Sequence, residues 1–347
     1  MKIIIDAMGG DNAPDQIVLG ALQSAKEFGI EIVLVGRGEQ VLSCMKAHGW
    51  DTLPAGVEVA NADDVVDMEA EPTEVVRQHK NSSMVIGLKM LADGAGDAFI
   101  SAGSSGALLT AATLIVKRIR GIRRAAFAPL LPIGGGTILV DAGANTECTP
   151  EYLLQFGCMG SLFAQKAHKK PSPRVALLNN GAEESKGDEL HREAYQLLKK
   201  AGENGTINFI GNIEARDVPD GGADVVVADG FSGNVLLKSV EGTAIYMSKL
   251  MKEMFTRSAV SKLGYLCCKK GVNHIKELMD YREVGGSMVI GIGKPVIKAH
   301  GSSDARAVRG AIKQAIGAVE SGFCDDIRAN VAAMTLPREG TAHAEEA

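Results

Sequence analysis

Short apolar runs alternate with longer amphipathic segments along most of the chain. The runs are rich in β-branched residues, which is typical of buried strands. They lie at residues 3–5, 32–35, 57–59, 98–100, 137–140, 175–178, 207–210, 224–227 and 287–290. Apolar residues at helical spacing lie between them, at residues 15–28, 73–91, 106–118, 150–166, 184–200 and 303–320. This alternation predicts an α/β fold with a mostly parallel sheet covered by helices on both faces.

Polar, glycine-rich turns follow many of these predicted strands. In open α/β sheets, ligands bind beyond the carboxyl ends of the strands. The turns lie at residues 6–11, 101–106, 141–145, 179–181, 211–212 and 229–230. The turn preferences of Gly, Asn, Asp and Ser explain any one of them. Six such turns at one edge of a sheet would favour a common cleft.

The stretch from residue 223 to residue 242 reads as a buried strand, a tight turn and the start of a helix. Unpaired backbone N–H groups and the positive end of the helix dipole favour an anion at such a turn. The sequence therefore predicts phosphate binding near Ser232, Gly233 and Asn234.

Lys186 lies in the acidic beginning of the predicted helix 184–200. A positive charge in the first turn of a helix is unfavourable to the dipole. The lysine either pairs with a neighbouring acid or meets a phosphate or a developing oxyanion.

A second strand, turn and helix start occupies residues 297–303, with Asp304 following. Ser302 and Ser303 suit an anion at the helix start. His300 is either a general acid or base or a structural hydrogen-bonding group.

Composition and net charge argue against several classes of function. The chain has 347 residues, 46% of them hydrophobic, and a net charge of -5, so nucleic acid is not an expected partner. Its six cysteines show no metal-binding spacing and indicate reduced thiols; a nucleophilic cysteine is the weaker alternative. Dinucleotide and P-loop fingerprints are absent, so we expect no cofactor and no metal. No signal-peptide core or membrane-spanning run is expected either.

Two basic clusters stand out from this acidic background. The first contains Arg118, Arg120, Arg123 and Arg124 and is either a solvated helix end or a docking patch for an acidic partner. The second belongs to a predicted amphipathic helical hairpin at residues 240–280, whose tip carries Leu263, Tyr265 and Leu266. Such a hairpin could lie on an anionic membrane, pack in a dimer, or do both. We expect one two-lobed α/β domain over residues 1–335 and a disordered tail over residues 336–347.

Taken together, these segments resemble the bacterial phosphate acyltransferases of phospholipid synthesis, the PlsX type. The matching motifs span nearly the whole chain in order. They are DAMGGDNAP from Asp6, SAGSSG from Ser101, DAGAN from Asp141, KGDE from Lys186, GNIE from Gly211, DGFSGN from Asp229 and IKAHGSS from Ile297. Ser104 and Ser105 stand where this family usually has Asn-Thr, which removes an amide contact at residue 104.

The resemblance implies a three-layer αβα fold similar to isocitrate and isopropylmalate dehydrogenases, assembled as a homodimer. It implies transfer of a long-chain acyl group from acyl carrier protein to inorganic phosphate, without a cofactor, with Lys186 and Asn234 serving catalysis. The acyl phosphate would feed a membrane glycerol-3-phosphate acyltransferase. The expected location is cytoplasmic, at the inner face of the cell membrane. Candidate phosphate-binding residues are Ser232, Gly233, His300, Ser302, Ser303, Ser104, Gly106 and Asn145.

The four arginines of the first basic cluster are the expected docking patch for the acidic carrier protein. A phosphotransacetylase acting on short acyl-CoA is the alternative enzyme, and a non-catalytic membrane scaffold for lipid enzymes is a third possibility.

Overall fold

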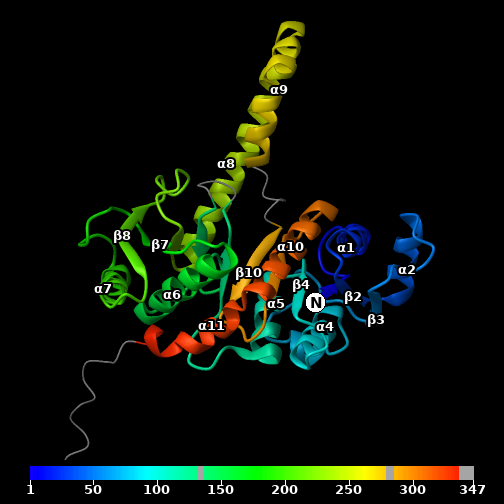
Figure 1. The fold of residues 1–347 in the computed structure, drawn as a ribbon, viewed down its shortest axis with the longest axis horizontal. Helices are drawn as coiled ribbons and strands as arrows, with labels where there is room; N and C mark the ends of the chain where they lie inside the picture. The colour runs from blue at the N-terminus through cyan, green and yellow to red at the C-terminus, as the bar shows by residue number, and fades with distance from the viewer. Residues whose placement is uncertain (132–135, 279–284, 336–347) are drawn as a thin grey trace, which may run out of the picture.

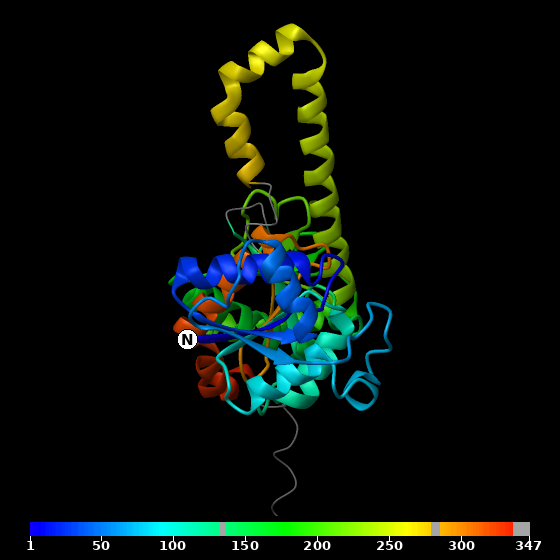
Figure 2. The same ribbon diagram turned by 90° about the vertical axis from the view of Figure 1, so that its right-hand side faces the viewer.

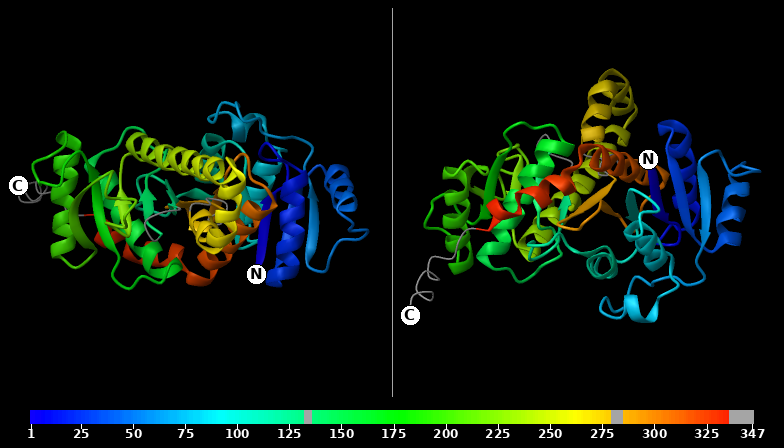
Figure 3. Two further views of the ribbon diagram at one scale, coloured as in Figure 1. Left: turned by 90° about the horizontal axis from the view of Figure 1, so that it is seen from above. Right: turned by 60° about the horizontal axis from the view of Figure 1, so that its bottom comes forward.

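The computed structural model describes residues 1–131, 136–278 and 285–335, which form two β-sheets flanked by helices (Figure 1). The first sheet has seven strands in the order β3-β2-β1-β4-β11-β10-β5, and the second has four in the order β6-β9-β7-β8. Figure 3 shows the two sheets in neighbouring lobes. The expected α/β class, with largely parallel strands between helices, is confirmed. The predicted tail 336–347 lies outside the described residues.

Every predicted strand is present, and the structure adds β5. The strands of the first sheet are β1 (Lys2–Asp6), β2 (Glu31–Gly36), β3 (Val57–Asn61), β4 (Ala98–Ser101), β5 (Ala126–Pro129), β10 (Gly286–Ile290) and β11 (Val296–Ala299). Those of the second are β6 (Ile138–Val140), β7 (Arg174–Asn179), β8 (Asn208–Glu214) and β9 (Val225–Val227). Strand β5 was missed because its sequence, AFAP, has no β-branched residue and ends in proline.

The helices cover the sheets on both faces. They are α1 (Asp15–Phe28), α2 (Gly38–Ala47), α3 (Val75–Gln78), α4 (Ser83–Ala92), α5 (Ser105–Ala112), the π-helical η1 (Thr113–Lys117), α6 (Pro150–Ala167), α7 (Glu189–Glu203), α8 (Gly230–Thr256), α9 (Ala259–Leu278), α10 (Ala305–Ser321), α11 (Phe323–Asn330) and the 3₁₀-helical η3 (Val331–Met334).

Two of the predicted helices differ clearly from the structure, whereas the other four agree with it to within two residues at each end. The predicted helix 73–91 is split into α3 and α4, because His79 Nδ1 lies 2.8 Å from Asp64 Oδ2 and Ser82 pairs with Asp64 as an isolated bridge. The predicted helix 184–200 starts only at Glu189, where Asp188 accepts the His191 N–H at 3.0 Å as N-cap. Lys186 therefore lies in a loop and not in a first helical turn.

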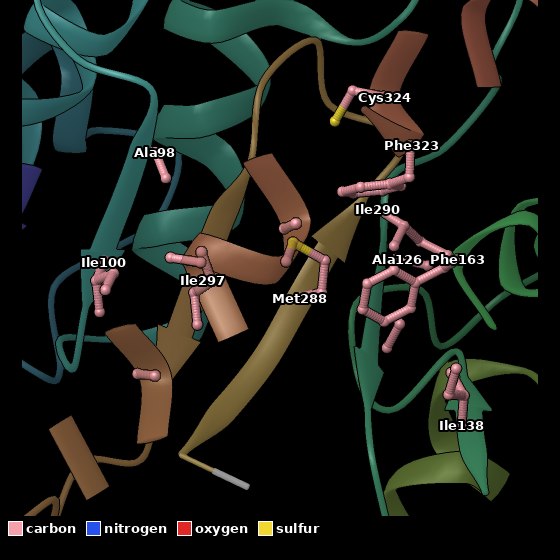
Figure 4. Packing of buried hydrophobic residues seen from close by; sticks show 14 of the residues in the cluster. Ala98, Ile100, Ala126, Ile138, Phe163, Met288, Ile290, Ile297, Phe323 and Cys324 are labelled. Atoms are coloured by element: carbon pink, nitrogen blue, oxygen red, sulfur yellow. The ribbon is translucent and has the colours of Figure 1, made fainter. Parts of the chain in front are cut away.

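Both faces of the first sheet are buried, which explains its continuously apolar strands. Ile3 and Ile5 face one hydrophobic cluster with helices α1 and α10, while Ile4 faces a second with α4. Figure 4 shows the first cluster passing from Ile100 and Ile297 through Met288 and Ile290 to Phe163 of α6. One continuous apolar core therefore joins the two lobes.

The strands of the two sheets run in opposite directions where the sheets meet. Strand β5 runs antiparallel to β10, and so parallel to β11 and β4. Leu130, just after β5, pairs antiparallel with Ile138 of β6, and the second sheet is parallel throughout. The turns after the strands thus leave the two sheets in opposite directions. The expectation that all six polar turns share one edge is wrong.

Helices α8 and α9 form a hairpin that extends away from both sheets (Figures 1 and 2). Helix α8 has 27 residues and is continuous from the core to the turn of the hairpin. Phe255 and Tyr265 pack edge to face across the two helices, with ring centroids 5.5 Å apart.

Candidate functional site

A cavity of about 380 Å³ lies between the carboxyl end of the first sheet and helix α8. This is where ligands bind in open parallel sheets. The residues lining it come from β5 and its ends, from α8, from β10, from the end of β11 and from the segments after β1, β3, β4 and β6. They include Asp11, Met68, Ser105, Phe127, Leu130, Ala142, Asn234, Leu237, Lys238, Glu241, Ser287, Lys298, His300 and Ser302. Polar groups thus converge on a partly apolar pocket, which is the usual form of a small-molecule site.

Lys298, on β11, is the most perturbed cation of this cavity. It pairs with Ser101 of β4, and its ammonium donates to the carbonyl oxygens of Ala102, at 3.4 Å, and Ala299. Desolvation and the nearby positive charge of Lys238 lower the pKa of Lys298 to about 8, although the carboxylates of Asp11 and Asp6 act in the opposite direction.

The turn after β11 holds His300 in a fixed orientation. The Ser302 backbone N–H donates to His300 Nδ1 at 3.3 Å, and the Ser302 hydroxyl lies 2.9 Å from the same nitrogen. An accepting Nδ1 puts the proton of the neutral ring on Nε2. Desolvation and then Lys238 lower the pKa of His300 below its usual value. His300 and Ser302 both line the cavity, whereas Ser303 is buried and its hydroxyl donates to His300 O at 2.6 Å.

The start of α8 differs from the anion site that the sequence predicted. Asp229 caps the helix and accepts the N–H groups of Phe231 and Ser232, each at 2.9 Å. The Gly233 N–H donates to Asp229 O, and the Gly230 N–H donates to Asn145 O. The backbone donors expected to hold phosphate at Ser232 and Gly233 are therefore occupied. Asn234, one residue further, lines the cavity.

Gly233 is required by the close approach of two chain segments. A Cβ atom at this position would lie 1.9 Å from Asp141 O, a contact that no side chain can make. The glycine lets α8 pack directly on the turn after β6.

Asn145 fixes the junction between the two sheets. Its amide donates to Ala125 O at 2.8 Å and to Asp141 Oδ2 at 3.0 Å. Asp141 also accepts the N–H groups of Phe127 and Ala144. Burial raises the pKa of Asp141, although these hydrogen bonds act against that rise. Asn145 is thus occupied in holding the junction, and it does not line the cavity.

Two predicted residues lie in the turn after β4. Ser104 precedes the first residue of α5 without a side-chain capping bond. At Gly106, a Cβ atom would lie 2.8 Å from Pro72 Cγ, so this glycine serves packing. Their neighbour Ser105 lines the cavity, whereas Ser104 and Gly106 do not.

Lys186 lies on an exposed loop after β7, outside the cavity lining. Its backbone N–H donates to Glu183 O at 3.1 Å, and its carbonyl accepts from Asn179 Nδ2 at 3.2 Å. Its side chain lies over Gly181. The structure therefore brings Asn234, His300 and Ser302 together and leaves Lys186 apart from them.

The arginine cluster lies at the other end of the first sheet. Arg118 pairs with Ile292, between β10 and β11, and all four arginines precede β5. Arg118, Arg120, Arg123 and Arg124 are exposed. Arg123 borders a hollow of about 1190 Å³ that Lys199 and Lys200 also line. The arginine cluster and the 380 Å³ cavity thus lie at opposite ends of the strands.

The hairpin carries many exposed apolar side chains. Leu263 and Leu266 are 64% and 65% exposed, and Val260 is 80% exposed, which is unusual for residues this apolar. Tyr265 is half-buried against Phe255. No helix within residues 1–131, 136–278 and 285–335 combines the length and apolar content needed to cross a bilayer.

All six cysteines lie among the described residues and are free thiols. Burial raises the pKa values of the Cys148, Cys158 and Cys324 thiols to about 12, so they stay protonated. The described part of the chain holds no group of three or more His, Cys, Asp or Glu placed to bind a metal ion.

Sequence reasoning missed Lys298 and Lys238. Lys298 is the only charged residue of the four in β11, VIKA, and its neighbours in the strand are buried. A lysine within an apolar strand is a recognisable signal, because a buried ammonium needs a reason. Lys238 gives no such signal, because it occupies an ordinary polar position of a helix.

Comparison with known proteins gives matches over most of the chain. A family model described as "Fatty acid synthesis protein" matches residues 1–326. A phosphate acyltransferase from Thermoanaerobacter pseudethanolicus is 46% identical over 336 residues, which cover 96% of this chain and 98% of the relative. One from Caldanaerobacter subterraneus is 46% identical over 317 residues, 91% of this chain and 92% of the relative.

Solved structures share the fold at low sequence identity. A phosphotransacetylase from Streptococcus pyogenes superposes with a TM-score of 0.61 at 19% identity, covering 92% of this chain and 94% of that one. A 4-hydroxythreonine-4-phosphate dehydrogenase from Klebsiella pneumoniae gives 0.54 at 14% identity, covering 92% and 99%. At these identities the likeness establishes the fold alone.

Proposed function

Because this chain belongs to the phosphate acyltransferase family, whose model is described as fatty acid synthesis protein, we propose that it transfers a long-chain acyl group from acyl carrier protein to inorganic phosphate. The observation that carries this proposal is the cavity at the end of the first sheet. It places two lysines, an asparagine and a histidine beside the apolar side chains of Phe127, Leu130 and Leu237. An anion and the first carbons of an acyl chain fit those two kinds of surface.

The reaction needs alignment and charge stabilisation. A phosphate oxygen attacks the thioester carbonyl carbon, the C–O bond forms, and a tetrahedral oxyanion develops. The C–S bond then breaks, and the leaving thiolate takes the proton that hydrogen phosphate carried. Asn234 is the proposed oxyanion donor from α8, and His300, which also lines the cavity, is the proposed group that passes the proton.

Lys186 stays a proposed catalytic residue on the family resemblance. Its exposed loop belongs to the second sheet, so in this arrangement it would act on a substrate that extends out of the cavity. The other candidate phosphate-binding residues contribute only indirectly, by shaping the turns around the cavity. They are Asn145, Ser232, Gly233, Ser303, Ser104 and Gly106.

The decisive experiment detects acyl phosphate directly. Purified protein is incubated with phosphate and a palmitoyl thioester of acyl carrier protein, and acyl phosphate is trapped with hydroxylamine as the hydroxamate. We expect phosphate-dependent hydroxamate. Loss of the thioester without a phosphate requirement would contradict the proposal. A series of donors from acetyl-CoA to palmitoyl carrier protein tests the alternative, since a phosphotransacetylase would prefer acetyl-CoA.

The exposed arginines remain the proposed docking patch for the acidic carrier protein. Their position at the far end of the strands means that the acyl arm must reach past the sheet, or into a partner subunit. We expect the change Arg120→Glu to raise KM for the carrier-protein thioester while leaving KM for the CoA thioester unchanged. If Lys249→Glu on α8 has this effect instead, the carrier docks on the hairpin side.

We further propose that the hairpin serves peripheral binding to an anionic membrane and packing in a homodimer. Exposed apolar residues beside Lys249, Lys252 and Lys262 support both uses. A peripheral location on the inner face of the cell membrane would bring acyl phosphate close to a membrane glycerol-3-phosphate acyltransferase. Sedimentation equilibrium of the purified chain tests the dimer, and a monomer at micromolar concentration would contradict it.

A further inference from the structure

Lys298 differs from the other cations of the cavity in having no negative partner. Across residues 1–131, 136–278 and 285–335, no carboxylate lies within ion-pair distance of its ammonium, which donates only to the carbonyl oxygens of Ala102 and Ala299. Lys238, in contrast, pairs with Glu241 at 2.7 Å. Lys298 is therefore the cation of the cavity whose positive charge a bound anion would neutralise.

Such an arrangement is costly without a ligand. Carbonyl oxygens replace only part of the hydration that an ammonium loses on burial. The depressed pKa of Lys298, about 8, reflects this cost. An anion beside the ammonium would remove it.

We infer that Lys298 is the cation that binds the orthophosphate substrate, with Ser302 and His300 as neutral donors on the same wall of the cavity. The inference rests on the proposed function and assigns its phosphate subsite to the end of β11. Asn234, on α8, lines the same cavity, so phosphate held at the end of β11 and the proposed oxyanion donor share one pocket. No role in binding phosphate is then left for Lys186.

The chain offers a matched control. Lys294 lies four residues before Lys298, at the opposite end of the same strand, and its ammonium also donates to a backbone carbonyl, Leu91 O at 2.7 Å. It is partly buried like Lys298 but does not line the cavity.

Equilibrium dialysis with radiolabelled orthophosphate, without any acyl donor, tests the inference. We expect Lys298→Met to weaken phosphate binding by about 100-fold, within the range found when one partner of a buried, hydrogen-bonded charge pair is truncated. Lys298→Arg should retain most of the affinity, and Lys294→Met should bind as the unchanged chain does. Wild-type affinity in a folded Lys298→Met variant would overturn the inference. So would loss of binding in Lys186→Ala.

A second measurement uses the unchanged protein and does not depend on any variant folding. Lysines are acetylated with limiting acetic anhydride, and mass spectrometry follows each modified peptide. We expect phosphate to protect Lys298 at least fivefold and to leave Lys186 and Lys294 unprotected. Equal labelling of Lys298 with and without phosphate would overturn the inference. Failure of the proposed acyl transfer is distinguishable, because both experiments omit the thioester.

Discussion

Two lysines at the ends of strands, Lys298 on β11 and Lys186 after β7, differ in everything except their residue type. Lys298 is enclosed by the first sheet and α8, and desolvation lowers its pKa to about 8. Lys186 is exposed on a loop of the second sheet. The sequence pattern drew attention to Lys186 and not to Lys298, but of the two only Lys298 lines the cavity. The difference teaches that the surroundings of a charge, more than its local sequence, decide whether it can hold an anion.

The largest effect expected outside the phosphate subsite concerns turnover. We expect Lys186→Ala and Asn234→Ala each to lower kcat at least tenfold while the fold stays unchanged, the scale of losing one contact to an oxyanion or another anion. Steady-state assays at saturating phosphate measure this. A wild-type kcat for Lys186→Ala would contradict this expectation and would show that the exposed lysine takes no part in catalysis.

The pH dependence of kcat/KM for phosphate tests whether Lys298 supplies the positive charge. Lys298 carries its charge below its pKa and loses it above, so kcat/KM for phosphate should fall by about tenfold per pH unit above pH 8. Arginine stays protonated throughout this range, so Lys298→Arg should lack this decline. Ionisation of phosphate itself affects both proteins equally. Parallel profiles for the two proteins would show that the titrating group is not Lys298.

The ion pairs of Asp224 in the second sheet are expected to affect the free energy of unfolding and not phosphate binding in the cavity. Asp224 accepts from Lys170 at 2.8 Å and from Arg174 at 3.1 Å. Burial alone would raise the pKa of Asp224, but these bonds outweigh it and lower the pKa to about 2. Asp224→Asn should therefore lower the free energy of unfolding by about 2 kcal/mol at neutral pH. Urea unfolding measures this, and phosphate affinity should not change in the folded variant.

The sign of the pH effect follows from the lowered pKa. Stability from Asp224 is fully present above the unfolded-state value near 3.8 and is lost as pH falls towards 2. The Asp224→Asn variant should lack this part of the acid destabilisation. An identical acid profile in both proteins would count against the two ion pairs.

The smallest effect on catalysis is expected at the hairpin. Leu263→Glu combined with Leu266→Glu should release the protein from anionic vesicles but leave activity on soluble substrates unchanged, since neither residue lies near the cavity. Vesicle sedimentation measures the binding. Leu114→Glu, at an exposed leucine of η1 that is 56% accessible, is the matched control. Unchanged sedimentation of the double variant would remove the membrane role.

Periodicity alone predicted most of the fold, because strands buried on both faces leave a strong apolar signal. It failed where that signal is weak, as in β5, or where a side chain ends a helix early, as Asp188 does before α7. It could not show that the chain builds two sheets of opposed direction, because strand order and direction arise from contacts distant in sequence.

The sequence predicted part of the candidate site, because polar residues that follow buried strands can be recognised from the pattern. Asn234, His300 and Ser302 follow strands and do line the cavity. Ser232 and Gly233 follow a strand equally well, but Asp229 occupies the amides there. A sequence shows which residues can donate hydrogen bonds, whereas their acceptors are fixed only by the folded chain.

Helix α8 runs without a break from Gly230 to Thr256, so the wall that carries Asn234 and Lys238 is the base of the same rod that carries the outer apolar turns. At about 1.5 Å per residue the rod is some 40 Å long. A contact on the outer half of α8 would therefore also influence the tilt of the helix at its base. The hairpin with the proposed membrane contact includes the same continuous helix that carries Asn234 at its base.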